Sequence, residues 1–464
     1  MATQHQLHVV MFPWLAHGHI TPFLELAKSL VTYELRISFV STPLNITRIK
    51  KQIVPGIELV ELPLPSIDGL PVGVESTAGL SEIGRTDLIP LLFQALDLCE
   101  QPFATLLKLL SPDFVIHDTT LYWIPRVAAK LGIPTINFTV VNVTSTSFTI
   151  GQHRDGLPQI PTASDICEPP LGFPSEVVRY RLFEARNQLP LYQNKQHGIC
   201  EGLSFMDRLC VSVEESWATV CNTCLELEGK FVDYFQTSTG RLMFPVGILI
   251  HRLPPWPAAE PCLAWLDRQA DRSVVFASFG SECLLAAQQL GALLLGLKES
   301  KIPFLCVLTG HAAAELQQGF VDRTNGRGLV VTEWAPQLHI LNHPSTGAFL
   351  SHCGWNSVTE GLRFGVPFVA LPIQYEQGLT ARLIADELRM GVEVKRNEED
   401  GSFTKEDIAR AVRAVMVGQE GCQIKSNVQE ISRVLTSNDS QVHRTNIHKF
   451  FSALKEKASR KQTV

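Results

Sequence analysis

Apolar and polar residues near the N-terminus follow first the period of a strand and then that of a helix. Leu7 to Phe12 is an apolar run of strand length, and apolar residues then recur every three to four positions from Phe23 to Leu30, as on one buried helical face. Thr21 is a good capping residue and Pro22 is favoured at the first helical position. The pattern therefore predicts a strand, a loop, and a helix that begins at Pro22.

The alternation of strands and helices continues through the first half of the chain. Short apolar runs at Arg36 to Val40, Phe114 to Ile116 and Thr135 to Phe138 predict further strands, and helix-length patterns separate them. Strands that alternate with helices favour a parallel sheet. The stretch from about Gly151 to Tyr180 is richer in proline and less periodic, and we interpret it as an insertion over a pocket.

A cluster of four prolines between positions 254 and 261 follows the apolar stretch Pro245 to Ile250 and predicts a linker between two domains. After it the pattern restarts, with a helix from Gln288 to Lys298. Thr404 and Asp407 form a capping-box pattern that opens a helix ending near Met416. The strands predicted in this half are Ser273 to Ser278, Phe304 to Leu308, Ala348 to Ser351 and Phe368 to Leu371.

These patterns predict an α/β protein with two doubly wound, Rossmann-like domains that face each other across a cleft. We place the N-terminal domain at residues 1–245, the linker at 246–261 and the C-terminal domain at 262–440. Ligands of such sheets bind beyond the carboxyl ends of the strands. In residues 441–464, apolar side chains at helical spacing predict a last helix that packs back on the N-terminal domain; they are Ile447, Phe450, Phe451 and Leu454.

Composition limits the classes of function. The chain has 464 residues, of which 45% are hydrophobic and 19% charged, as in folded multidomain proteins. Its 40 basic and 46 acidic residues give a net charge of −6 without a long basic run, so we expect no nucleic-acid partner. The apolar runs are too short for membrane insertion, and eleven scattered cysteines favour reduced thiols. We expect a cytoplasmic monomer.

One segment of the second half has the pattern of an anion site. A strand that ends at Ser351 leads into the turn His352 to Gly354, and a helix opens near Trp355. The free N–H groups and the positive dipole end of that helix would point at one place, which suits a diphosphate. Side chains of this segment add hydrogen-bonding groups for the diphosphate and the sugars and an aromatic face for a nucleobase. The hydrogen-bonding side chains are His352, Asn356, Ser357, Glu360, Glu376 and Gln377, and the aromatic face is that of Trp334.

The segment Trp334 to Gln377 (WAPQLHILNHPSTGAFLSHCGWNSVTEGLRFGVPFVALPIQYEQ) resembles the signature box of plant secondary-product UDP-glycosyltransferases of family 1. The turn Phe279 to Ser281 and TCLELEG at Thr223 to Gly229 are also similar to that family. The resemblance implies the GT-B fold, a UDP-sugar donor and a small-molecule hydroxyl acceptor, without a metal or other cofactor. It implies donor binding by Ser281, Trp334, Ala335, Gln337, His352, Gly354, Trp355, Asn356, Ser357, Glu360, Glu376 and Gln377.

Within that box the resemblance implies a division of roles. Trp334 would stack on the uracil and Gln337 would hydrogen-bond to it, while Glu360 would bind the ribose. The diphosphate would be held by His352, Asn356 and Ser357, and the transferred sugar by Trp355, Glu376 and Gln377.

Two residues of the first half are candidates for the chemistry of glycosyl transfer. An acceptor hydroxyl needs a base, and histidine suits that role near pH 7. His19 follows the first strand, and Asp118 follows the strand Phe114 to Ile116, so that Asp118 could orient the His19 ring. The resemblance implies that these two are the catalytic residues of an inverting displacement. His17 and His117 are neighbours that could be confused with them.

Other functions remain as alternatives at this stage. A nucleotide-dependent dehydrogenase would share the doubly wound domains, but neither leading strand is followed by a G-x-G-x-x-G fingerprint. A non-catalytic binding protein would not need His19 and Asp118. The stretches Phe12 to Leu30 and Ser278 to Glu282 resemble the branch that adds a sugar to the sugar of a flavonoid or terpenoid glycoside. Transfer to a free aglycone hydroxyl stays open, as do UDP-rhamnose and UDP-xylose in place of UDP-glucose.

Overall fold

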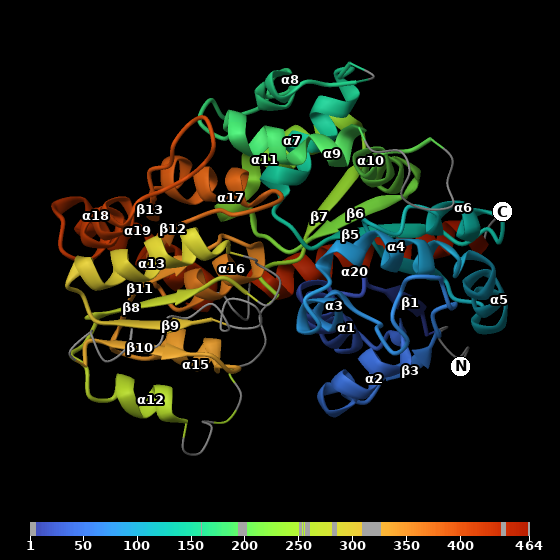
Figure 1. Cartoon of the computed structure of the whole chain (residues 1–464). Coiled ribbons are helices and arrows are strands. Elements are labelled where there is room, and N and C mark those ends of the chain that lie inside the picture. The colour runs from blue at the N-terminus through green and yellow to red at the C-terminus, as the bar shows by residue number, and fades with distance from the viewer. Residues whose placement is uncertain are drawn as a thin grey trace.

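The computed structural model describes residues 6–158, 160–193, 202–249, 253, 255, 260–280, 285–308, 326–437 and 442–462. The chain builds two parallel sheets, each covered by helices (Figure 1). In Figure 1 the blue-to-green half of the chain lies to the right of the yellow-to-orange half. The predicted pair of doubly wound α/β domains is therefore confirmed.

The first sheet has seven strands in the order β3-β2-β1-β4-β5-β6-β7, and all its neighbours pair in parallel. The interior strands are almost entirely buried, as expected for a sheet covered on both faces. Its strands are β1 (His8–Phe12), β2 (Arg36–Ser41), β3 (Ile57–Glu61), β4 (Phe114–Asp118), β5 (Thr135–Thr139), β6 (Ala218–Cys221) and β7 (Leu242–Pro245).

The second sheet has six strands in the order β10-β9-β8-β11-β12-β13, again all parallel. Sequence analysis found four of these strands and missed β10 and β13, which lie at the two edges of the sheet and are only partly buried. The strands are β8 (Val274–Ser278), β9 (Phe304–Val307), β10 (Gly328–Val331), β11 (Thr346–Ser351), β12 (Phe368–Ala370) and β13 (Gly391–Glu393).

Helices connect the strands in both halves. In the first half they are α1 (His17–Val31), α2 (Pro43–Ile49), α3 (Thr77–Glu82), α4 (Ile89–Asp97), α5 (Glu100–Leu110), α6 (Ile124–Ala129), α7 (Val143–Arg154), α8 (Ala163–Cys167), α9 (Leu182–Gln193), α10 (Phe205–Glu215) and α11 (Leu225–Thr239). In the second half they are α12 (Pro261–Leu266), α13 (Ala287–Ser300), α15 (Gln337–Asn342), α16 (Trp355–Arg363), α17 (Gln377–Arg382), α18 (Lys405–Met416), α19 (Gln419–Ser437) and α20 (Val442–Gln462).

The local signals for helix starts gave one correct and one wrong prediction. The capping box at Thr404 and Asp407 is formed and opens α18. The predicted start at Pro22 is wrong, because α1 begins at His17 with Ala16 as its capping residue and carries Pro22 inside the helix. His19 therefore lies in the first turn of α1 and not in a loop.

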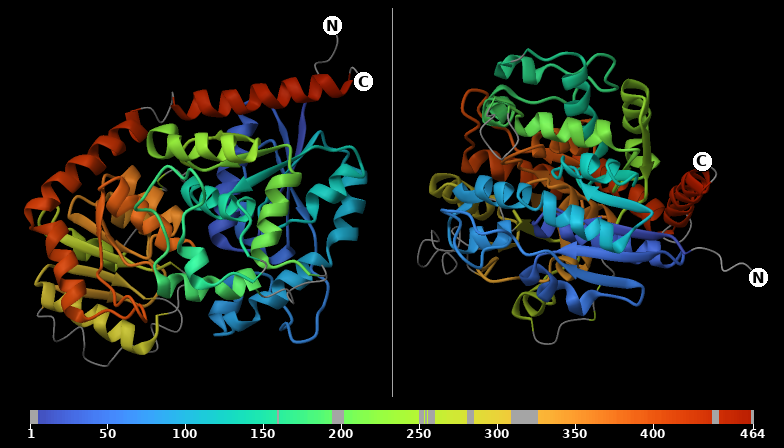
Figure 2. Two further views of the ribbon diagram at one scale, coloured as in Figure 1. Left: turned by 90° about the horizontal axis from the view of Figure 1, so that it is seen from above. Right: turned by 90° about the vertical axis from the view of Figure 1, so that its right-hand side faces the viewer.

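Helix α20 lies along the first half of the molecule (Figure 2). Its buried face consists of Ile447, Phe450, Phe451 and Leu454, which join the core around β1 and α1. Tyr33 Oη at the end of α1 donates to the Arg444 carbonyl at 3.0 Å. Burying each of these apolar side chains is worth about 1.5–3 kcal/mol, so this face holds the helix in place. Among the helices described, none combines the length and the apolar character needed to cross a membrane.

The segment after β7 meets the start of α20. Gly247 has a φ of +82°, and its N–H donates to the Thr223 carbonyl at 2.9 Å. A Cβ atom on Gly247 would lie 2.7 Å from His443 Nδ1 and 3.3 Å from His443 Cα. Both the backbone conformation and the close approach therefore require glycine at this position.

We expect Gly247→Ala to lower the melting temperature more than Gly240→Ala does. Both glycines have a positive φ, where alanine costs about 1–2 kcal/mol, but a Cβ atom on Gly240 meets nothing within 4 Å. Thermal unfolding followed by circular dichroism measures the two shifts. Equal shifts would show that the start of α20 gives way without cost.

Candidate active site

The first sheet reverses its strand order between β1 and β4, which leaves a crevice at the carboxyl ends of these two strands. His19 follows β1 in the first turn of α1, and Asp118 is the last residue of β4. His19 Nδ1 lies 2.6 Å from Asp118 Oδ2. The topology thus brings together two side chains that are far apart in sequence.

The surroundings of Asp118 keep its carboxylate charged. Burial alone would raise the pKa of Asp118, but the nearby His19 and hydrogen bonds from His19 and Thr120 outweigh burial, so that the pKa lies below its usual value. Thr120 donates to Asp118 Oδ1 through its backbone N–H at 3.0 Å and its hydroxyl at 2.9 Å. With the Nδ1 proton held by Asp118, Nε2 is the ring atom of His19 that can accept a proton.

The two neighbouring histidines differ from His19 in their surroundings. His117 is fully buried, with Nδ1 at 3.0 Å from the Asp118 carbonyl and Nε2 at 3.0 Å from Ser216 Oγ. Burial lowers the pKa of His117 to about 4, so its imidazole is neutral at pH 7. His17 is exposed at the first position of α1. His19 contacts the buried carboxylate of Asp118 itself, whereas His117 contacts the backbone carbonyl of that residue.

The second sheet reverses its order between β8 and β11. The turn after β11 packs tightly there, because Cys353 has a φ of +65° and a Cβ atom on Gly354 would lie 2.5 Å from His352 Nε2. Burial lowers the pKa of His352 to about 4, which keeps the ring neutral at pH 7. Its Nδ1 atom is buried and finds no hydrogen-bond partner among the described residues.

Helix α16 begins directly after this turn. Gly354 supplies no side-chain cap, and the first intrahelical hydrogen bond runs from the Val358 N–H to the Gly354 carbonyl at 3.0 Å. The N–H groups of Trp355, Asn356 and Ser357 therefore have no acceptor within the helix. Together with the helix dipole they form an anion site at the second crevice.

The residues assigned to the nucleoside lie around the same helix. Gln337 Nε2 donates to Glu360 Oε2 at 2.6 Å and lies 3.5 Å from Ser357 Oγ. The Gln337 N–H donates to the Ala335 carbonyl at 2.9 Å. Trp334 precedes this cluster and is 76% exposed, so its ring face is open to a ligand.

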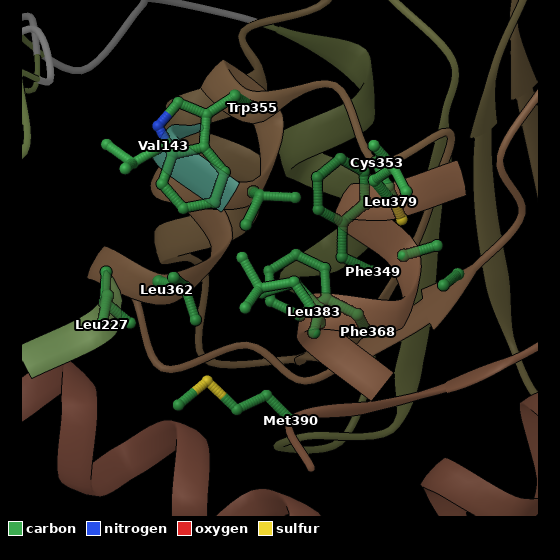
Figure 3. Close-up of a cluster of buried hydrophobic side chains, with 14 of the residues drawn as sticks. Val143, Leu227, Phe349, Cys353, Trp355, Leu362, Phe368, Leu379, Leu383 and Met390 are labelled. Carbon is green, nitrogen blue, oxygen red and sulfur yellow. The ribbon is translucent and has the colours of Figure 1, made fainter. Parts of the chain in front are cut away.

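Trp355 is placed differently from the role implied for it. Its side chain is 3% exposed, and its Nε1–H donates to the Asn222 carbonyl at 2.7 Å. Figure 3 shows the indole beside Val143, within a cluster that also contains Leu227 from the first half. The indole N–H therefore forms a hydrogen bond that joins the two halves of the chain.

Glu376 and Gln377, which the sequence predicts to bind the transferred sugar, lie at the start of α17. Gln377 Oε1 accepts the N–H groups of Ile373 and Gln374, each at 3.0 Å, which leaves the amide nitrogen of Gln377 for other partners. Burial raises the pKa of Glu376, while the nearby His19 acts in the opposite direction. Tyr375 has a strained φ of +54°, and its carbonyl accepts Gln188 Nε2 at 2.8 Å.

Asn356 reaches the first half of the chain through its side chain, with Nδ2 at 2.7 Å from the Gly18 carbonyl. Ser281 lies outside the described residues.

Sequence analysis missed Thr120, Asn222 and Gln188. Thr120 had a signal, because an aspartate side chain often accepts the backbone N–H two residues further along the chain. Gln188 donates to the Tyr375 carbonyl, and the Asn222 carbonyl accepts the indole N–H of Trp355. Both partners are far away in sequence, and no local pattern indicates them.

Comparison with known proteins agrees with this architecture. A family model described as UDP-glucoronosyl and UDP-glucosyl transferase matches residues 244–442. An anthocyanidin-3-O-glucoside rhamnosyltransferase of Petunia hybrida is 36% identical over 94% of this chain and 93% of its own. UDP-glycosyltransferase 91D2 of Stevia rebaudiana is 37% identical over 97% of this chain and 95% of its own.

A solved structure matches the whole chain. The crystal structure of Glycyrrhiza uralensis UGT73P12 complexed with glycyrrhetinic acid 3-O-monoglucuronide superposes with a TM-score of 0.82, at 25% identity, over 99% of this chain and 98% of the other. The fold is thus that of the GT-B glycosyltransferases. The chain belongs to the plant family 1 UDP-glycosyltransferases, and it is an enzyme that transfers a sugar from a UDP-sugar to a small molecule.

The two tryptophans of the signature box should respond differently to mutation. We expect Trp334→Ala to leave the melting temperature unchanged and to weaken UDP binding, by an amount set by a base-stacking energy of about 1–3 kcal/mol. We expect Trp355→Phe to lower the melting temperature, because it leaves the buried Asn222 carbonyl without its donor. Calorimetric titration with UDP and thermal unfolding test both, and a reversed pattern would contradict the assignment.

Proposed function

We propose that this enzyme transfers a hexose, with inversion, from a UDP-sugar to a sugar hydroxyl of a small-molecule glycoside. His19 is the general base in this proposal, and Asp118 orients it. The observation that carries the proposal is the His19–Asp118 contact at the crevice of the first sheet, with an anion site at the crevice of the second. Asn356 connects these two places directly.

The proposed reaction is a single displacement. The acceptor oxygen attacks the anomeric carbon of the donor sugar while His19 Nε2 takes its proton. The bond between the anomeric carbon and the diphosphate oxygen breaks, and UDP leaves with the electron pair, so the configuration inverts. The charged Asp118 stabilises the imidazolium that forms, which supports a general-base contribution of roughly 10²–10⁴-fold in rate.

The leaving diphosphate needs groups that meet its growing negative charge. The N–H groups and dipole at the start of α16, together with the side chains of His352 and Ser357, support this role. We assign Trp334, Ala335, Gln337 and Glu360 to the nucleoside, and Gln377 and Glu376 to the transferred sugar. Because these groups can meet the charge of the leaving diphosphate, we propose a reaction that needs neither a metal nor another cofactor.

Two comparisons support a glycoside as the acceptor. The Petunia hybrida relative is named for anthocyanidin-3-O-glucoside, and the Glycyrrhiza uralensis structure contains a 3-O-monoglucuronide. Both compounds already carry a sugar. The donor in our proposal is UDP-glucose, and the alternatives are UDP-rhamnose and UDP-xylose. Of these two alternatives, the name of the Petunia hybrida relative favours UDP-rhamnose. Direct transfer to a free aglycone hydroxyl is the second candidate function.

The domain roles follow from the same proposal. Residues 1–245 would bind the acceptor and residues 262–440 the UDP-sugar, with 246–261 as the linker and 441–464 as the returning helix. A monomer in the cytoplasm remains our expectation. The described cysteines are all free thiols, which supports a reducing compartment.

We expect His19→Ala to reduce kcat by roughly 10²–10⁴-fold and to leave the dissociation constant of UDP near that of the wild type. Asp118→Asn is the matched variant, because it keeps an acceptor oxygen for Nδ1 but removes the charge. It should also lower kcat without weakening UDP binding. Initial rates and calorimetric titration measure these effects. If His19→Ala keeps most of its activity, another residue is the base.

A transfer screen detected by mass tests the substrates. The purified enzyme is incubated with UDP-glucose, UDP-rhamnose or UDP-xylose against quercetin and quercetin 3-O-glucoside, each with and without EDTA. We expect transfer to the glucoside only, at a rate that EDTA does not change. Transfer to quercetin would favour the aglycone alternative, and strong inhibition by EDTA would overturn the metal-independent reaction.

A further inference from the structure

Helix α1 contains a backbone carbonyl, that of Gly18, which has no hydrogen-bond donor at the usual position within the helix. In an α-helix the N–H of residue 22 would donate to the carbonyl of residue 18, but proline has no N–H. A proline ring inside a helix also clashes with the carbonyl four residues before it, which here is the Gly18 carbonyl. The carbonyl next to His19 in sequence therefore needs a donor from elsewhere.

The donor comes from the other half of the molecule. Asn356 Nδ2, in the first turn of α16, lies 2.7 Å from the Gly18 carbonyl oxygen. A Cβ atom on Gly18 would lie 3.6 Å from Asn356 Nδ2, which is ordinary van der Waals contact. The preceding residue, Trp355, is itself fixed by its hydrogen bond to the Asn222 carbonyl. Asn356 thus extends from a backbone that is already anchored.

We propose that Asn356 is a positioning residue that sets the place of His19 relative to the donor. This inference rests on the proposed function, in which His19 is the base. The base and the anion site belong to different sheets, so a change in the angle between the two halves would alter their separation. The Asn356–Gly18 hydrogen bond joins the first turns of α1 and α16 and opposes such a change. A misplacement of 1 Å can cost about 10²-fold in rate.

The resemblance to the family implies a different role for Asn356, namely that its side chain holds the diphosphate. The two roles predict different effects. A diphosphate ligand contributes to the affinity for UDP, whereas a positioning residue contributes to turnover while the backbone N–H groups, His352 and Ser357 still bind the diphosphate.

The first test is Asn356→Ala. We expect kcat to fall about 10- to 100-fold while the dissociation constant of UDP stays within about threefold of the wild type. Hydrogen exchange of the amides at positions 17–21, measured by mass spectrometry, should become faster. A loss of UDP affinity as large as the loss of kcat would overturn the inference and identify Asn356 as a diphosphate ligand.

The second test changes the other side of the contact without touching the donor site. Pro22→Ala supplies an N–H within α1 that can donate to the Gly18 carbonyl in competition with Asn356. We expect kcat to fall several-fold with unchanged UDP affinity, and we expect no further loss when the change is added to Asn356→Ala, because both remove one contact. The control is Pro43→Ala at the start of α2, which should leave kcat unchanged.

The outcomes separate this inference from the proposed function. A wild-type enzyme that transfers no sugar would contradict the proposed function. Wild-type exchange rates at positions 17–21 in Asn356→Ala would overturn the positioning role, whether or not sugar is transferred. Full activity of Pro22→Ala would also overturn it.

Discussion

The burial of Trp355 between the two halves of the chain is the contact on which the site depends. Its indole N–H donates to the Asn222 carbonyl, at the end of a strand of the first sheet, and its ring joins a cluster with residues of both halves. Trp355 is also the first residue of α16. The position of the anion site relative to the first sheet is therefore fixed by the packing of the same residue that begins the helix.

Buried charges add a second connection between the halves. Arg382 at the end of α17 pairs with Glu184 of α9 and lies 3.1 Å from Glu393 Oε1. Arg181, just before α9, also reaches Glu393 at 3.1 Å. Removing these charges from water is costly, so such a network adds little net stability, but loss of one member would leave its partners buried and unpaired. It holds α9 beside the turn that carries Glu376 and Gln377.

Both sheets use the same principle to create a site. A doubly wound sheet leaves a crevice where the strand order reverses, and here one crevice holds His19 and Asp118 and the other holds His352 and the start of α16. Neither crevice is sufficient alone. The proposed glycosyl transfer needs the two crevices to face each other, and Trp355, Asn356 and Arg382 make contacts between the two halves of the chain.

The sequence by itself determined the alternation of strands and helices, the capping box at Thr404 and the order of polar residues in the signature box. These features depend on neighbours within a few positions, where the side-chain period is visible. The start of α1 could not be predicted, because Pro22 lies inside the helix, where a sequence pattern places the helix start instead. The Gly18 carbonyl, which Pro22 leaves without an intrahelical donor, accepts a hydrogen bond from Asn356, 338 positions away. Likewise, the sequence shows Trp334 and Trp355 as similar aromatic residues. Only tertiary packing exposes the first and buries the second.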